Sequence, residues 1–291
     1  MLLLGVRTAP TIARGTDVEA MVHRREQRVK IHAMPDATNI GVKIHYEVEG
    51  SGPPLVLAHG LGYSGEDWRD FGYVDLMTQD FQLILVDHRG HGKSDKPHGP
   101  AAYSPEMRVN DHVAVLDELG IRQAHFWGYS MGGAVAFMIG KWAPDRFRSL
   151  IIGGEDPYPP PKALPDAPNP LLEVMKQGGG AWVRHREANM DLTPAMKARY
   201  RENDFEALLA LRQNPYRWGE QIVPILPHFP IPSLLYGGEA EDVFFTMKEA
   251  ASAMPAATFV SFPKYDHVDI WVKSGEIVPQ VRRFLDMHPI A

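Results

Sequence analysis

A glycine-flanked serine in the middle of the chain constrains the fold more than any other feature. Residues 128–132 read Gly-Tyr-Ser-Met-Gly, after an apolar run at 124–127 and before a run of helical composition at 134–139. Strand, sharp turn and helix in that order is the context in which Gly-x-Ser-x-Gly forms a nucleophile elbow. The strained turn needs small residues two before and two after the serine, and the two glycines supply them. The motif predicts that Ser130 presents its hydroxyl above a sheet edge, over a helix N-terminus that favours negative charge.

The composition is that of a globular protein and excludes several classes of partner. The chain has 291 residues, of which 44% are hydrophobic and 23% charged, and a formal charge of −6, which argues against nucleic acid or an anionic membrane surface as the main partner. It has 0 cysteines, so disulfides, thiol catalysis and cysteine-bound metals are excluded. No apolar run approaches the roughly 20 residues of a membrane span, and the first residues lack a signal-peptide pattern. We therefore expect a soluble, cytoplasmic protein.

Strand and helix patterns alternate along most of the chain. Residues 42–48 alternate apolar and polar side chains, which is typical of a half-buried strand. Short apolar runs predict buried strands at 55–58 and 81–86, and further strands are predicted at 150–152, 234–236 and 257–262. Helical patterns occupy 105–119, 245–254 and 275–287. Together these patterns predict an α/β protein with a mostly parallel central sheet and helices on both of its faces.

Two segments interrupt this alternation. Residues 1–33 show no clear period and are interpreted as an N-terminal extension. Dense prolines after Gly154, followed by helical patterns, indicate an inserted helical cap at 156–227. The α/β core then comprises 34–155 and 228–291. The cap carries aromatic residues that predict a mostly apolar pocket between cap and sheet: Trp182, Tyr200, Phe205, Tyr216 and Trp218.

Several motifs in a fixed order carry a family likeness. His59-Gly60 is followed by Asp-His-Arg-Gly-His-Gly-Lys-Ser at 87–94, by the serine motif, by carboxylates after a late strand, and by His267. This order resembles the α/β-hydrolase fold superfamily, and in particular its serine-nucleophile, esterase- or lactonase-like members with a helical cap. The likeness runs from about Val42 to Leu285, without most of the cap. It implies the α/β-hydrolase fold and a triad in the order nucleophile, acid, histidine.

The resemblance assigns the nucleophile and the base. A serine hydroxyl is a weak nucleophile at neutral pH, so Ser130 needs a base within hydrogen-bond reach. His267 follows the last predicted strand and precedes the last helix, where the family keeps its base. The family often has glycine before this histidine, whereas this chain has Asp266. That departure is expected to alter the loop or to add a charge beside the base.

The resemblance leaves the acid open among four residues. The family usually places it after the strand that precedes the last helix–strand unit. The common spacing points to Glu241, but one extra loop residue would bring Asp242 to that place, and we favour Asp242 because aspartate is the more usual choice. A rarer arrangement takes the acid from the strand after the elbow helix, and would use Asp156 or Glu155.

Two backbone N–H groups are expected to bind the oxyanion. They suit this task because their positions are set before the reaction begins. The elbow provides the N–H of Met131, and the resemblance provides the N–H of Leu61, which follows His59-Gly60. We expect His59 to give hydrogen-bonding support to that turn. In the family, the turn that contains His88 and His91 braces the strand and the elbow rather than doing chemistry.

No cofactor is expected. The histidines do not have the spacing of a helical metal motif such as His-Glu-x-x-His, and no glycine-rich stretch has the form of a phosphate-binding loop. The partner expected from the motifs is a small-molecule ester or lactone. The sequence carries no signal of oligomeric state.

These features predict a serine hydrolase that cleaves a carboxylic ester or lactone through an acyl-enzyme on Ser130. Haloalkane dehalogenases and epoxide hydrolases resemble this fold but use an aspartate at the elbow, so Ser130 argues against both. Cofactor-free perhydrolases or haloperoxidases and carbon–carbon bond hydrolases share the serine triad and stay open as alternatives. A small-molecule receptor on a hydrolase scaffold is a further alternative of a different class.

Overall fold

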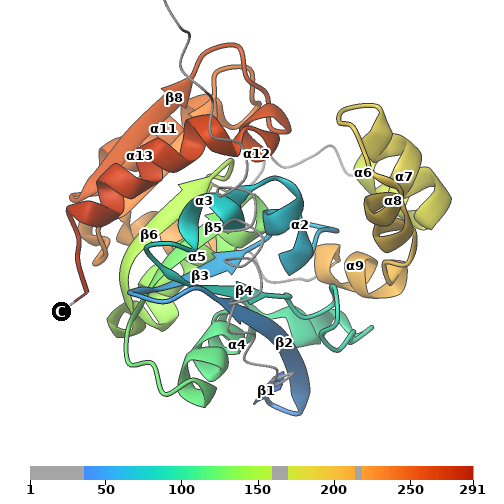
Figure 1. The fold of residues 1–291 in the computed structure, drawn as a ribbon, viewed down its shortest axis with the longest axis horizontal. Coiled ribbons are helices and arrows are strands. Elements are labelled where there is room, and N and C mark those ends of the chain that lie inside the picture. Colours follow the sequence, from blue (N-terminus) through green and yellow to red (C-terminus); the bar gives the residue numbers. More distant parts are fainter. Residues whose placement is uncertain (1–35, 159–169, 214–217, 291) are drawn as a thin grey trace, which may run out of the picture. The chain divides into compact units, whose positions relative to one another are not determined.

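A computed structural model describes residues 36–158, 170–213 and 218–290. The predicted extension at 1–33 lies outside the described residues, as do Tyr216 and the side chain of Trp218. The strands are β1 Asp36–Asn39, β2 Val42–Glu49, β3 Pro54–Ala58, β4 Gln82–Val86, β5 Ala124–Tyr129, β6 Phe147–Gly153, β7 Ser233–Gly238 and β8 Ala257–Phe262 (Figure 1).

The helices predicted at 105–119, 245–254 and 275–287 are α4, α11 and α13, with each end within one residue of the prediction. The α-helices are α2 Gly65–Asp70, α3 Tyr73–Met77, α4 Pro105–Glu118, α5 Met131–Trp142, α6 Pro170–Lys176, α7 Gly179–Glu187, α8 Pro194–Arg201, α9 Phe205–Arg212, α10 Trp218–Ile222, α11 Phe244–Ala253, α12 Asp269–Val272 and α13 Ser274–Asp286. The 3₁₀ turns are η1 Pro100–Tyr103, η2 Pro144–Arg146 and η3 Val223–His228. Within the described ranges, no helix is long and apolar enough to cross a membrane.

The described strands form one sheet in the order β1-β2-β4-β3-β5-β6-β7-β8. β1 pairs with β2, and β2 with β4, in antiparallel fashion, whereas all later neighbours are parallel. The predicted mostly parallel α/β sheet is therefore confirmed. The carboxyl ends of β3, β5, β6 and β7 meet at one edge, which is where side chains distant in sequence can converge.

The continuous apolar strands supply both faces of the sheet. Successive side chains of a strand point to opposite faces, so Val56 of β3 joins one core cluster and Leu57 joins the other. In β5, Phe126 and Trp127 divide in the same way. The cluster that contains Phe126 is covered by α4, α5 and α11, and the cluster that contains Trp127 by α2, α3, α12 and α13.

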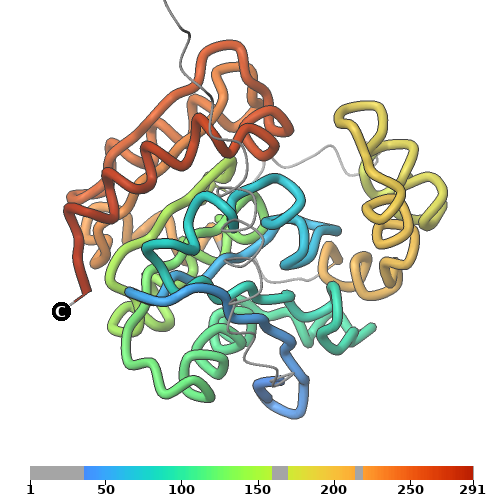
Figure 2. The backbone as a smooth tube through the Cα atoms, in the orientation of Figure 1, coloured from blue at the N-terminus to red at the C-terminus, as the bar shows by residue number. Residues whose placement is uncertain are grey.

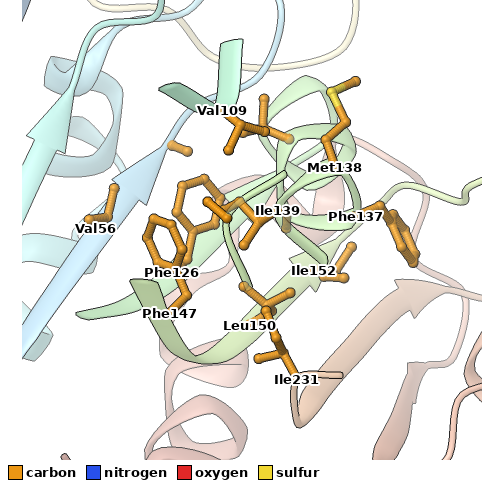
Figure 3. Close-up of a cluster of buried hydrophobic side chains, with 14 of the residues drawn as sticks. Val56, Val109, Phe126, Phe137, Met138, Ile139, Phe147, Leu150, Ile152 and Ile231 are labelled. Atoms are coloured by element: carbon orange, nitrogen blue, oxygen red, sulfur yellow. The ribbon is translucent and has the colours of Figure 1, made fainter. Parts of the chain in front are cut away.

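Helix α5 packs on the first of these faces. Figure 3 shows its side chains Phe137, Met138 and Ile139 beside those of β5 and β6. All residues of α5 from Gly132 to Gly140 are buried, because the helix crosses directly over the strand that precedes it. This burial holds the helix N-terminus at a defined height above the carboxyl end of β5.

Helices α6 to α9 follow β6 and precede β7 in the sequence, and they form a group of their own (Figures 1 and 2). Their buried side chains join the Trp127 cluster: Met175, Trp182, Val183, Met196, Tyr200 and Leu208. In contrast, Ile222 of α10 and Leu226 of η3 belong to the Phe126 cluster, and α10 contacts α5. Part of the stretch that we expected in the cap, 218–227, thus packs as core.

Candidate active site

The serine motif forms the predicted strained turn. Ser130 has φ 52° and ψ −116° between the end of β5 and the start of α5, a conformation that L-residues with side chains rarely adopt. A Cβ on Gly128 would lie 2.1 Å from the carbonyl oxygen of Gly132, and a Cβ on Gly132 would lie 2.1 Å from that of Ala58. Both positions therefore exclude any side chain. We call residues 128–133 the elbow.

The structure brings His267 to the serine hydroxyl. The Nε2 atom of His267 lies 3.1 Å from Ser130 Oγ, although 137 positions separate the two residues. His267 follows β8 and precedes α12, and its side chain is 44% exposed. The elbow places the serine at the carboxyl edge of the sheet, and the loop after β8 reaches the same edge. The hydroxyl and the imidazole are therefore within proton-transfer distance.

Tyr129, the residue before Ser130, also contacts His267. Its hydroxyl donates to the backbone carbonyl of His267, and its ring stacks on Trp271 with centroids 4.4 Å apart. The sequence motif treats this position as variable, so its role in holding the histidine loop was not predicted.

Asp266, where the family often has glycine, organises the same loop. Its Oδ1 atom accepts hydrogen bonds from the N–H groups of Val268 at 2.8 Å and Asp269 at 2.9 Å. A carboxylate at this position satisfies amides at the start of the short helix α12. The departure from the family pattern therefore has a local structural cause.

The carboxylate beside the imidazole of His267 belongs to Glu241, the alternative candidate, and not to the favoured Asp242. Glu241 Oε2 lies 2.6 Å from His267 Nδ1, and its Oε1 accepts from the N–H of Gly238 at 2.7 Å. The Glu241 side chain is 1% exposed, whereas Asp242 is exposed. The reason is a tight turn: the N–H of Glu241 donates to the carbonyl of Gly238 at 3.1 Å, which leaves no room for the extra loop residue that Asp242 needed.

This contact also sets the histidine tautomer. The carboxylate of Glu241 is an acceptor, so the proton of a neutral His267 belongs on Nδ1. The Nε2 lone pair then faces Ser130 Oγ and can accept its proton.

The other two candidate acids have different partners. Asp156 accepts from the N–H of Tyr158 at 2.7 Å and from the hydroxyl of Thr246 at 2.6 Å. Burial raises the pKa of Glu155 to about 8, so this carboxyl is mostly uncharged at pH 7 and is unsuited to stabilise an imidazolium. Gly154, which lies just before them, has φ 61°, and a Cβ there would lie 3.0 Å from His267 Nδ1. This close approach was not predicted either.

The two segments that carry the expected oxyanion donors both border Ser130. Met131 is the first residue of α5, where helix N–H groups have no partner inside the helix. Its carbonyl accepts a hydrogen bond of 3.2 Å from Arg108 of α4, a guanidinium whose pKa burial lowers to about 10. Opposite, a Cβ built on Gly60 would lie 3.4 Å from Ser130 Cβ. The turn that carries Leu61 therefore borders the nucleophile.

We call residues 59–63 the oxyanion turn. The N–H of Tyr63 donates to the carbonyl of Gly60 at 3.3 Å, and Gly62 has φ 72°. A four-residue turn with positive φ at its third position and not at its second is of type II. Leu61 occupies the second position, with its N–H in the peptide that joins it to Gly60.

His59 orients that peptide. Its Nε2 accepts from the N–H of His88 at 3.1 Å, so its proton belongs on Nδ1, which lies 2.8 Å from the carbonyl of Gly60. The carbonyl of Gly60 and the N–H of Leu61 share one planar trans peptide and point in opposite directions. The imidazole that holds the carbonyl therefore also aims the N–H.

His59 is part of a buried imidazole cluster with His88, His91 and His112. The ring centroid of His59 lies 4.7 Å from that of His88 and 5.2 Å from that of His91, and the ring centroids of His88 and His112 are 5.0 Å apart. Burial lowers the pKa of all four, to about 3 for His112. Within 36–158, 170–213 and 218–290, no three histidine or carboxylate side chains converge so as to hold a metal ion.

Comparison with known proteins agrees with this architecture. The family described as alpha/beta hydrolase fold matches residues 53–193. A solved structure described as Est816, an N-acyl homoserine lactone degrading enzyme, superposes with a TM-score of 0.70 at 26% identity, over 86% of this chain and 100% of that one. The chain has the α/β-hydrolase fold. The predicted resemblance to that superfamily is confirmed.

Curated relatives of this α/β-hydrolase-fold protein match over shorter stretches. A protein named as a carbamate hydrolase, RutD of Azorhizobium caulinodans, is 34% identical over 119 residues, which are 41% of this chain and 43% of the relative. Bifunctional epoxide hydrolase 2 of Mus musculus is 28% identical over 180 residues, or 60% of this chain and 32% of the relative. The matched region thus spans less than half the length of these curated relatives.

Proposed function

We propose that the protein is a serine hydrolase that cleaves a carboxylic ester or lactone through an acyl-enzyme on Ser130. The observation that carries this proposal is the continuous chain of contacts from Ser130 Oγ to His267 Nε2 at 3.1 Å and from His267 Nδ1 to Glu241 Oε2 at 2.6 Å. A nucleophile, a base and a group that orients the base, in that geometry, is the arrangement that acyl transfer needs.

In the acylation step, His267 Nε2 takes the proton of Ser130 as Oγ attacks the acyl carbon. The carbonyl electron pair moves onto oxygen, where the N–H groups of Met131 and Leu61 stabilise it in this proposal. The tetrahedral intermediate then collapses, and His267 returns the proton to the departing alkoxide. Water activated by His267 attacks the acyl-enzyme in the same way and releases the acid.

Glu241 stabilises the imidazolium that forms in both steps. Its carboxylate is buried, faces Nδ1 directly and has its second oxygen occupied by the N–H of Gly238. The negative charge is therefore held in one orientation, and the attraction is stronger than in water because solvent is excluded.

Two comparisons bear on the substrate class. The solved structure whose title names lactone degradation supports an ester or lactone, because a lactone is a cyclic ester and opens by the same steps. The epoxide hydrolase relative does not transfer its named activity, since that activity uses an elbow aspartate and this chain has Ser130. The carbamate named for RutD is also an acyl compound and belongs in the test panel.

The test is the variant Ser130→Ala, assayed on a panel of p-nitrophenyl esters, lactones and aryl carbamates. Removing the nucleophile should lower kcat by at least about 10⁴-fold, with an unchanged far-UV spectrum and thermal midpoint. A fluorophosphonate should label Ser130 in the unaltered protein and leave the variant unlabelled. Turnover that survives in Ser130→Ala would reject the mechanism.

The same panel separates the alternatives. Addition of hydrogen peroxide or of a vinylogous diketone tests for a perhydrolase or a carbon–carbon bond hydrolase on the same triad. Tight binding of a small molecule with very slow turnover would identify a receptor instead.

A further inference from the structure

The cap contacts the oxyanion turn directly. Arg186 of α7 donates from Nη2 to the carbonyl of Leu61 at 2.8 Å and from Nη1 to the hydroxyl of Tyr63 at 2.9 Å. Asn203, between α8 and α9, donates to the carbonyl of Gly62 at 2.9 Å. Residues more than 120 positions away in the sequence therefore hold two successive carbonyls of the turn.

The guanidinium of Arg186 is fixed in place by two aromatic rings. Its Cζ lies 4.3 Å from the ring centroid of Tyr63 and 4.5 Å from that of Trp182. A guanidinium is attracted to the face of an aromatic ring, and two such contacts on one group leave it little freedom. The donor therefore stands over the Leu61 carbonyl before any substrate arrives.

Trp182 also covers the turn. A Cβ on Gly62 would lie 2.3 Å from Trp182 Cζ2, so the indole lies against the backbone of the turn where only glycine leaves room. The cap therefore contributes hydrogen-bond donors to Leu61, Gly62 and Tyr63, and a packing surface to Gly62.

The carbonyl that Arg186 binds belongs to the peptide that distinguishes the two common turn types. Type I and type II turns differ by a flip of the peptide between the second and third residues, here Leu61 and Gly62. Glycine at the third position makes both orientations accessible. His59 holds the preceding peptide, through the Gly60 carbonyl, but does not hold this one.

We propose that Arg186 is a positioning residue that locks the oxyanion turn in its type II form, so that the cap completes the oxyanion hole. This inference rests on the proposed function, because the oxyanion role of Leu61 is part of it. A flip of the Leu61–Gly62 peptide changes ψ of Leu61 and reverses the dipole of the peptide next to the oxyanion donor. Loss of the hold on the Leu61 carbonyl also leaves the turn freer to move, so that the Leu61 N–H is less well aimed at the oxyanion. Arg186 prevents this without touching substrate.

The structure offers a symmetrical pair of contacts that supports this reading. Each residue that is proposed to give an oxyanion N–H has its own carbonyl held by an arginine: Met131 by Arg108 and Leu61 by Arg186. One arginine comes from the core helix α4 and the other from the cap helix α7.

The chain also provides a matched control. Arg199 of α8 is a second cap arginine that reaches the core, donating to Asp67 at 3.0 Å and to Asp70 at 2.5 Å. Both acceptors lie in α2, beyond the oxyanion turn. Loss of Arg199 loosens the cap without freeing the Leu61 carbonyl.

The experiment compares Arg186→Met, Arg186→Lys and Arg199→Met, with rates normalised to the sites titrated by a fluorophosphonate. Arg186→Met should lower kcat about 10-fold and change KM less than about threefold, because it weakens one oxyanion donor. Its Ki for a boronic acid, which forms a tetrahedral adduct on serine, should rise by the same factor as kcat/KM falls. Arg186→Lys, which keeps one donor, should be intermediate, and Arg199→Met should keep kcat within about twofold.

Two outcomes would overturn the inference. One is an Arg186→Met protein whose kcat stays within twofold of the unaltered protein, or whose loss appears in KM alone. The other is equal loss in Arg186→Met, Arg186→Lys and Arg199→Met, which would show general loosening of the cap. Activity that persists in Ser130→Ala would instead reject the proposed function, so the two failures are distinguishable.

Discussion

The triad and the oxyanion turn are stabilised in different ways. Ser130, His267 and Glu241 are carried by loops at one edge of the sheet, and glycine packing and core contacts hold them there. The carbonyls of the oxyanion turn are held by His59 from the core and by Arg186 and Asn203 from the inserted helices. In the described part of the chain, the triad contacts thus come from the core, whereas the oxyanion turn is held by the core and the cap together. This comparison predicts that changes to the triad affect activity most and that changes beneath the turn affect stability more than rate.

The largest effect is expected from the acid. Glu241→Gln keeps the shape of the side chain but removes the charge that orients and stabilises His267, so kcat should fall about 10³–10⁴-fold. The neighbouring variant Asp242→Asn is the control and should stay within about twofold, since Asp242 is exposed. Steady-state kinetics on one ester measures both. A large loss in Asp242→Asn with little loss in Glu241→Gln would reverse the assignment.

A smaller effect is expected from the packing of the elbow. Gly132→Ala places a Cβ 2.1 Å from the carbonyl oxygen of Ala58, so backbone must move, at a cost of about 3 kcal/mol in the free energy of unfolding. Gly275→Ala in α13 is the control, because a Cβ there meets no atom within 4 Å, and it should be neutral or slightly stabilising. Urea unfolding measures both variants. Equal stability of the two would show that the elbow is less tightly packed than the structure indicates.

The smallest effect is expected from a change in the buried imidazole cluster beneath the oxyanion turn, measured in the free energy of unfolding. Neither ring nitrogen of His112 has a hydrogen-bond partner among the residues that the structure describes, and the ring meets Phe126 edge-on at 5.0 Å. His112→Phe should therefore gain about 1 kcal/mol in the free energy of unfolding at pH 7.5. Burial lowers the pKa of His112 to about 3, against about 6.5 in the unfolded chain. The unfolded state therefore binds the extra proton, and stability is lost as pH falls from about 6.5 towards 3.

At pH 5, protonation of this single histidine in the unfolded state should lower the free energy of unfolding by up to about 2 kcal/mol. The variant His112→Phe should not show this loss. Urea unfolding at pH 7.5 and pH 5 checks the sign, and kcat at pH 7.5 should be unchanged, since the ring of His112 packs against His88 and Phe126 and not at the proposed catalytic residues. The exposed His98, whose pKa is raised by Asp204, is a control of opposite sign: His98→Gln should lose stability at pH 5 relative to pH 7.5. Equal acid sensitivity of His112→Phe and the unaltered protein would show that His112 is not the group that titrates.

The features that local sequence determines could be predicted, whereas those that depend on how a turn closes or how the cap docks could not. The fold, Ser130 and the placement of His267 could be predicted because glycine spacing, apolar runs and motif order are local signals. The choice between Glu241 and Asp242 could not, since it depends on whether one turn closes on its fourth residue. No sequence pattern pointed to the proposed role of Arg186. That role arises from the docking of the cap, and an arginine on a helix is otherwise interpreted as a solvated charge.

The contact from Tyr129 to the carbonyl of His267 has a practical consequence for protein engineering. The residue before Ser130 also anchors the loop that carries the proposed base His267. A saturation library at position 129 would therefore alter catalysis whatever it did to substrate range.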